Sequence, residues 1–103
     1  MQSGADTTEI YLAEIVTSCR LGDYGDASSL INRCIPSFEA LQKDPAIASA
    51  RKPLLDKINF SLETVVLMLG RKDWVAVADI IEFELLPMWT DIQKTSTGPT
   101  TVP

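Results

Sequence analysis

The chain has 103 residues, of which 46% are hydrophobic and 22% are charged, and these values suit one globular domain. Its formal net charge of −5 argues against a nucleic acid as partner, because a phosphate backbone is bound by a basic surface. No stretch approaches the roughly 18 apolar residues of a membrane span, and the first residues lack a signal-peptide pattern, so we expect a cytoplasmic protein that does not bind membranes.

A first helix is predicted over residues 8–20, after a flexible N-terminus over residues 1–7. Asp6 and Glu9 have the three-residue spacing of a capping box. The next apolar residues repeat at helical steps of three and four: Leu12, Ile15, Val16 and Cys19. The glycines and aspartates of residues 22–26 then predict a turn, in which Asp23 or Asp26 caps the next helix.

A second helix is predicted over residues 26–43. Its buried face comprises Leu30, Ile31, Cys34, Phe38 and Leu41. Pro36 interrupts this helix, since proline lacks an amide donor and its ring clashes with the preceding turn. Because the apolar period passes through Pro36 unshifted, we expect a kink there instead of a break.

The connection to the third helix contains two prolines. Asp44 followed by Pro45 has the pattern of a helix start, and Pro53 either kinks the next helix or begins a new one. At about 1.5 Å per residue, a helix from Pro45 to Leu69 would measure about 37 Å and overhang its neighbours. We therefore predict a connector with one helical turn over residues 44–52 and a third helix over residues 53–70.

The third helix carries the most regular apolar pattern of the chain, which is typical of bundle packing: Leu55, Ile58, Leu62, Val65 and Leu69. Gly70 is predicted to end this helix, and Asp73 to cap the next one. The connection between them is so short that the two helices are expected to be antiparallel neighbours.

The fourth helix, predicted over residues 73–92, is apolar on two sides. One stripe is expected to face the core: Trp74, Val77, Ala78, Ile81, Leu85 and Met88. The opposite side of a soluble helix should be polar, but here it is apolar around one acid. We predict that this second surface is a partner or dimer interface, made by Val75, Asp79, Ile80, Phe83 and Leu86.

Two further expectations concern this second surface. An acid within it requires a hydrogen-bond donor, for which Arg33, Arg51, Lys57 or a partner's hydroxyl are the candidates. The alternative is that the second helix, or the connector over residues 44–52, folds over the surface and buries it inside the monomer. Trp74 and Trp89, at the two ends of the fourth helix, are expected to be core anchors.

Together these elements predict an all-α, antiparallel, up-down-up-down four-helix bundle as a single domain over residues 8–93. The polar segment of residues 94–103 is predicted to be a disordered tail. The predicted core comprises Leu12, Ile15, Cys19, Ile31, Cys34, Phe38, Leu55, Ile58, Leu62, Val65, Leu69, Trp74, Val77, Ile81 and Leu85.

The residue types argue against an enzyme. The chain has no histidine, so its serines lack the base of a catalytic triad. Di-metal sites of helical bundles require Glu-x-x-His pairs, which the acids Glu14, Asp56 and Glu63 and those of the fourth helix cannot supply. Cys19 and Cys34 are interpreted as reduced thiols on apolar faces, although a disulfide between consecutive helices is geometrically feasible. We expect no cofactor and no metal.

The chain resembles the flagellar export chaperones of the FliS and FliT type over residues 21–92. The resemblance rests on the order of Gly22-Asp23, the helical segment Ile35-Pro-Ser-Phe-Glu-Ala-Leu41 and Lys72-Asp73 before the final helix. It implies a small helical bundle that grips an aggregation-prone helical partner. Residues 78–87 match no signature of that family and also resemble small bacterial helical proteins of unassigned function.

These expectations lead to two functional hypotheses. The first is a non-enzymatic protein-binding bundle, adaptor or export-chaperone-like, that presents an apolar helix surface to a protein partner. The second is a self-associating homodimeric structural bundle, in which a second copy covers the apolar surface of the fourth helix. A surface that awaits another protein predicts a monomer, whereas a surface covered by its own copy predicts a dimer.

Overall fold

The computed structural model describes residues 4–97, with side chains over residues 7–94. These residues form helices joined by short turns and contain no strand, which confirms the all-α expectation. The elements in chain order are α1 (Gly4–Leu21), α2 (Tyr24–Gln42), α3 (Pro45–Ala50), α4 (Lys52–Gly70), α5 (Trp74–Ile80), the π-helical η1 (Ile81–Leu85) and α6 (Leu86–Thr97).

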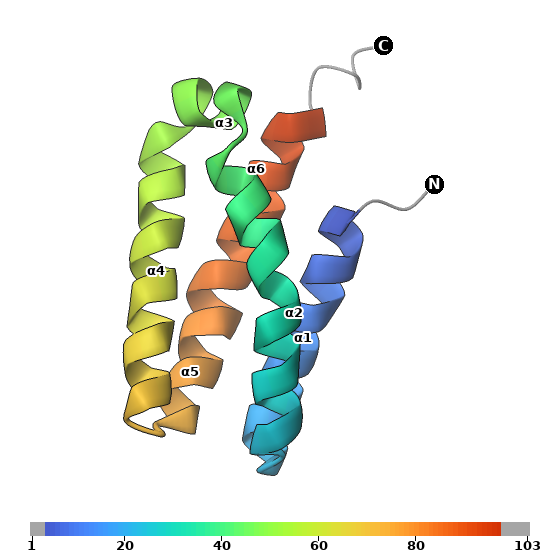
Figure 1. The fold of residues 1–103 in the computed structure, drawn as a ribbon, viewed down its shortest axis with the longest axis vertical. Helices are drawn as coiled ribbons and strands as arrows, with labels where there is room; N and C mark the ends of the chain where they lie inside the picture. The colour runs from blue at the N-terminus through green and yellow to red at the C-terminus, as the bar shows by residue number, and fades with distance from the viewer. Residues whose placement is uncertain (1–3, 98–103) are drawn as a thin grey trace.

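The long helices run along the molecule and alternate in direction (Figure 1). The segments α5, η1 and α6 succeed one another without a break and form one long helix. The short α3 lies at the end of the molecule where α2 passes into α4 (Figure 1). Near this corner, the guanidinium of Arg51 donates a hydrogen bond of 3.0 Å to the carboxylate of Asp91 in α6.

Aspartates cap three of the helices. The side chain of Asp23 accepts a hydrogen bond from the amide of Asp26, so Asp23 is the cap of α2. Asp44 caps α3 and Asp73 caps α5 in the same way, as expected from the sequence. Pro53 lies in the first turn of α4, where its missing amide donor is tolerated, and therefore begins this helix.

The ends of the helical region extend beyond the predicted bounds. α1 begins at Gly4, within the segment predicted to be flexible, and α6 reaches Thr97, four residues into the predicted tail at 94–103. Residues 1–3 and 98–103 of those two predictions lie outside the described residues. α2 is continuous through Pro36, as the unshifted apolar period predicts.

The helix α4 ends at Gly70, as predicted, but its cap does not use a glycine. Gly70 is the last helical residue, and the left-handed conformation belongs to Lys72, with a φ of 58°. The amide of Asp73 bonds the carbonyl of Met68 and the amide of Lys72 bonds that of Leu69, which is the Schellman pattern. The helix end predicted at Gly70 is therefore confirmed, but the left-handed residue of the cap is Lys72 and not a glycine.

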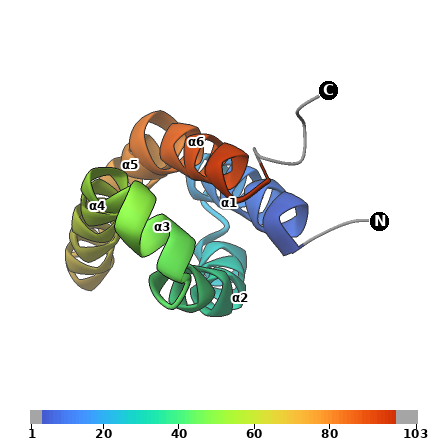
Figure 2. The ribbon, with the colours of Figure 1, turned by 90° about the horizontal axis from the view of Figure 1, so that it is seen from above.

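The packing of the helices leaves one side open. α1 packs along α2 and against α5, η1 and α6, and α4 packs against α5, η1 and α6. α2 and α4 do not pack along each other, and the view from above shows the space between them, bridged at one end by α3 (Figure 2). The fourth side, which a closed bundle would fill with an α2–α4 contact, is a groove.

Most of the predicted core is buried, and three of its four half-buried residues lie at this open side. Ile31, Leu62 and Leu69 are only half-buried, because they line the space between α2 and α4. Trp74 is half-buried because it lies at the first turn of α5, where its ring stacks on Tyr24 at 4.6 Å. Buried hydrophobic residues outside the predicted core are Val16, Ala27, Leu30, Leu41, Ile47, Ala78, Trp89 and Ile92.

A π-turn interrupts the last long helix just before Trp89. Within η1 the amide of Leu86 bonds the carbonyl of Ile81, five residues back, just before Pro87, which has no amide hydrogen to donate. The extra residue rotates the remainder of the helix by about 100° relative to a regular α-helix. Trp89, expected as a core anchor, lies four residues after the buried Leu85, is 3% exposed and packs edge-on against Phe38 at 5.1 Å. Met88 of the predicted stripe is half-buried.

Candidate functional site

The open side of the helices is an apolar groove of about 330 Å³, here called the α2–α4 groove. Its first wall belongs to α2 and consists of Ile31, Cys34, Ile35 and Phe38. Its second wall belongs to α4 and consists of Leu62, Val65, Val66 and Leu69. Its floor consists of Leu12 and Ile15 of α1 and of Ile81 and Leu85 of η1.

Both walls have the same apolar spacing. The four residues of each wall occupy positions i, i+3, i+4 and i+7, which is how a helix presents one face to a neighbouring helix. At the rim, Ile35 is 46% exposed and Val66 is 66% exposed. Each of the two helices therefore presents an apolar face that no other helix within residues 4–97 fully covers.

Polar groups mark one end of the groove. Gln42 of α2 and Asn59 of α4 hydrogen-bond to each other through their side-chain amides, with distances of 2.7 and 3.1 Å. Glu39 lies on the rim beside them and is exposed. Apart from these groups, the lining of the groove is almost entirely hydrocarbon.

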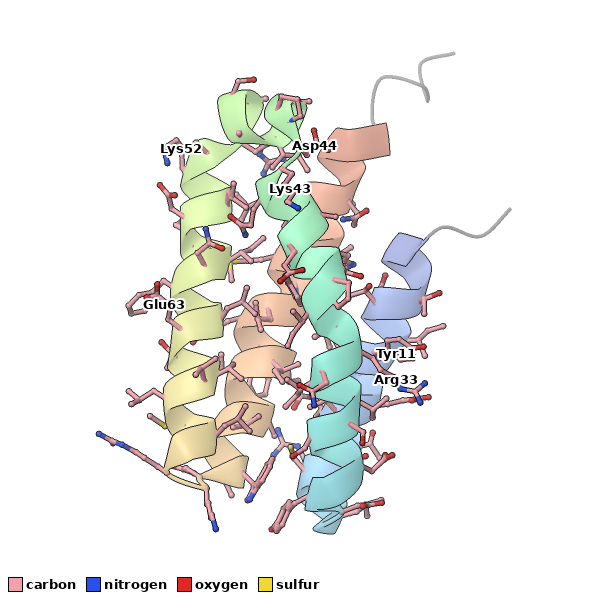
Figure 3. All side chains as sticks on the ribbon, viewed as in Figure 1. Tyr11, Arg33, Lys43, Asp44, Lys52 and Glu63 are labelled. Atoms are coloured by element: carbon pink, nitrogen blue, oxygen red, sulfur yellow. The ribbon has the colours of Figure 1, made fainter. Side chains whose placement is uncertain are left out.

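Two charged residues of the wall helices, Arg33 and Glu63, point away from the groove. Figure 3 shows the side chains of Arg33 on α2 and Glu63 on α4 directed outward, to opposite sides of the molecule. Lys43 and Asp44 lie near the polar end, where α2 passes into α3 (Figure 3). The groove is thus a hydrophobic strip between polar outer surfaces, the arrangement expected of an interaction site.

The thiol in the groove is not a reactive group. Cys34 is 3% exposed, and burial raises the pKa of its thiol to about 11, so the sulfur is protonated near neutral pH. Cys19 is also buried, and burial raises the pKa of its thiol although Arg20 lies nearby. Both cysteines are free, as their interpretation as reduced thiols predicts.

The five residues of the predicted interface do not share one environment. Val75 and Phe83 are exposed, at 69% and 67%. Ile80 and Leu86 are half-buried and pack against the core. The alternative that α2 or the connector buries this surface inside the monomer is wrong for Val75 and Phe83.

Asp79, the acid of the predicted interface, is exposed and has a donor within its own chain. Arg20 of α1 donates hydrogen bonds to the carboxylates of Asp79, at 3.1 Å, and of Glu82, at 2.6 Å. Both carboxylates raise the pKa of Arg20, with Glu82 contributing most. The donor is therefore Arg20 and none of the predicted Arg33, Arg51 and Lys57. Arg20 was missed because the sequence alone does not show that α1 lies beside α5 and η1.

Phe83 belongs to a second surface, which sequence reasoning missed in part. It lines a shallow depression of about 550 Å³ between α4 and the segment η1–α6, together with Phe60 of α4, which is 68% exposed. Lys57 of α4 and Glu84 of η1 also line this depression. We call this surface the outer face and define its apolar part as Leu54, Phe60, Phe83, Pro87 and Met88.

Metal binding and membrane crossing find no support in the described residues. No group of three or more His, Cys, Asp or Glu side chains in this part of the chain is placed to hold a metal ion. Within the same residues, no helix combines the length and the apolar character that crossing a membrane requires.

Comparison with known proteins identifies the family of the chain. A family model described as "Domain of unknown function (DUF8042)" matches residues 5–95, which is most of the chain, so the chain belongs to this family. No curated protein and no solved structure gives a significant match.

Proposed function

We propose that this member of the DUF8042 family is a non-enzymatic protein-binding bundle, adaptor or export-chaperone-like, that takes an amphipathic helix of a partner protein into the α2–α4 groove. In this proposal the fold is an antiparallel, up-down-up-down four-helix bundle left open between α2 and α4. The partner helix completes the packing. The protein acts by contact in the cytoplasm and requires no cofactor, nucleic acid or membrane.

The observation that carries the proposal is the matched spacing of the two walls. Each wall presents two helical turns of apolar residues, which correspond to about 10 Å along the helix axis. A helix that lies between α2 and α4 could pack against both of them and against the floor residues Ile81 and Leu85. This is the helix-in-groove mode of recognition, in which the bound helix inserts residues i, i+3, i+4 and i+7.

The polar end of the groove indicates the orientation of the partner helix. Glu39 is exposed on the rim and makes no ion pair among the described residues. A lysine or arginine at one end of the partner's apolar strip would complement it, while aliphatic residues fill the space between the walls. The acidic character of the chain, with a net charge of −5, also favours a basic partner.

A selected peptide tests the proposal. A displayed library of helical peptides with randomised residues at i, i+3, i+4 and i+7 would be selected against the full chain, and the bound peptide mapped by NMR chemical shifts. We expect the largest shifts at Ile35, Val66 and the other wall residues. Shifts confined to the outer face, or a library that yields no saturable binder, would contradict the proposal.

A further inference from the structure

The outer face lies on α4, η1 and α6, whereas the walls of the α2–α4 groove lie on α2 and α4. Phe60 and Phe83 are the most prominent residues of this face, each about two-thirds exposed. Leu54 and Met88 are half-buried in the depression between the helices, and Pro87 borders it. Two exposed phenyl rings from different helices thus line one depression, and clustered exposed apolar residues of this kind mark interaction sites.

The same face carries both signs of charge. Lys57 of α4 and Glu84 of η1 both line the depression, and neither makes an ion pair within the described part of the chain. Asp56, the other acid of the lining, is paired with Lys52 at 3.2 Å. Glu84 accepts a hydrogen bond of 2.8 Å from the buried hydroxyl of Ser61, which fixes one carboxylate oxygen and leaves the other available. The position of the acid is therefore set by the fold.

A surface of this kind is self-complementary. A two-fold axis brings the same patch of two subunits together, so that residue i of one copy meets residue j of the other and the reverse. Here a depression lies beside exposed phenyl rings, and an unpaired base lies on the same face as an acid. A two-fold contact between two such faces would place the phenyl rings of each copy at the depression of the other and would set Lys57 of each against Glu84 of the other.

We propose that the outer face is a homodimer contact, whose occupant is the outer face of a second copy of this chain. The proposal is independent of the function of the α2–α4 groove, because the two surfaces use different faces of α4. It also revises the interface predicted from the sequence. Phe83 belongs to the contact, Phe60 joins it from α4, and Val75 lies outside the depression.

Sedimentation equilibrium of the full chain over a concentration series tests the dimer. We expect the apparent mass to rise from that of one chain, 11.3 kDa, toward twice that value. Phe60→Glu and Phe83→Glu should each raise the dimer dissociation constant at least tenfold and leave the far-ultraviolet circular dichroism unchanged, because both rings are exposed. Val75→Glu, which changes an equally exposed residue outside the depression, should dimerise like the unchanged chain.

Exchanging the charges of Lys57 and Glu84 tests whether the two copies meet in the proposed geometry. Lys57→Glu and Glu84→Lys should each weaken dimerisation. In either variant homodimer, residues 57 and 84 carry the same charge and face each other at both contacts. A mixture of the two variants should regain the dimer, because the mixed pair opposes unlike charges at both contacts. A chain that stays monomeric at high concentration would overturn the proposal, as would a dimer that survives Phe83→Glu or is lost with Val75→Glu.

Discussion

The side-chain amides of Gln42 and Asn59 hydrogen-bond to each other in both directions, at 2.7 and 3.1 Å, across the polar end of the α2–α4 groove. This pair joins two helices that do not pack along each other. It therefore fixes the separation of the groove walls at one end, while α3 forms the covalent connection between them.

A double-mutant cycle should measure this link. We expect Gln42→Ala and Asn59→Ala to show a coupling free energy of about 0.5–1.5 kcal/mol in urea unfolding, the range for an ordinary pair of hydrogen bonds. The control cycle combines Gln42→Ala with Thr64→Ala, whose hydroxyl bonds the carbonyl of Phe60 in its own helix. Additive effects at Gln42 and Asn59 would show that the amide pair does not hold the walls.

The groove predicts unequal costs for two alanine substitutions on α4. Ile58 is fully buried, so Ile58→Ala should lower the free energy of unfolding by about 2–5 kcal/mol. Leu62, one helical turn further along, is half-buried and lines the groove. Leu62→Ala leaves no closed cavity, so it should lower the free energy of unfolding by less than half as much. Equal losses in urea unfolding would indicate that the groove closes in solution.

The left-handed residue after α4 offers a stabilising substitution. Lys72 has a φ of 58°, a conformation that glycine adopts without a steric penalty. Lys72→Gly should raise the free energy of unfolding by about 0.5–1 kcal/mol, or the melting temperature by several degrees. Gly70→Ala should also stabilise the protein, because Gly70 is helical and a Cβ there meets open space. Destabilisation by Gly70→Ala would indicate that Gly70, and not Lys72, adopts the left-handed conformation.

The thiol of Cys34 predicts a loss of stability in alkali. Burial raises its pKa from 9.0 to about 11, so between these values the unfolded chain has released a proton that the folded chain retains. The stability that this thiol contributes is complete below pH 9 and is lost as the pH rises through 11, by up to about 1.4 kcal/mol per pH unit. The free energy of unfolding, measured in urea at several pH values from 8 to 11, should fall less steeply with pH for Cys34→Ala than for the unchanged chain. Equal dependence on pH in the two proteins would place the thiol in contact with water.

Local physics made much of the fold predictable. Asp44 and Asp73 begin helices because their short side chains accept hydrogen bonds from the free amides of the first helical turn. An aspartate directly before apolar residues at helical spacing predicts this role. The third helix was placed by comparing lengths, and Pro53 lies in its first turn as that comparison predicts. The helix end at Gly70 is confirmed, but glycine content alone does not show that Lys72 adopts the left-handed conformation of the Schellman turn.

The groove was not predictable from the same patterns. The wall spacing at Leu62, Val65 and Leu69 is visible in the sequence, but a periodic apolar face does not reveal whether a neighbour covers it. The π-turn before Pro87 also changes the register of the last helix, and a regular period cannot show this. The sequence pointed instead to the surface around Phe83, because two apolar sides on one helix are visible in a sequence whereas a gap between two helices is not.

The affinity of a selected helical peptide for two neighbouring variants tests the central claim most directly. Val66 lines the groove and Leu67, the next residue, does not, although both are more than half exposed. We predict that Val66→Glu raises the peptide dissociation constant at least tenfold, whereas Leu67→Glu changes it less than twofold and both variants keep the circular dichroism of the unchanged chain. Equal effects of the two substitutions, or none from Val66→Glu, would contradict the assignment of the α2–α4 groove as the binding site.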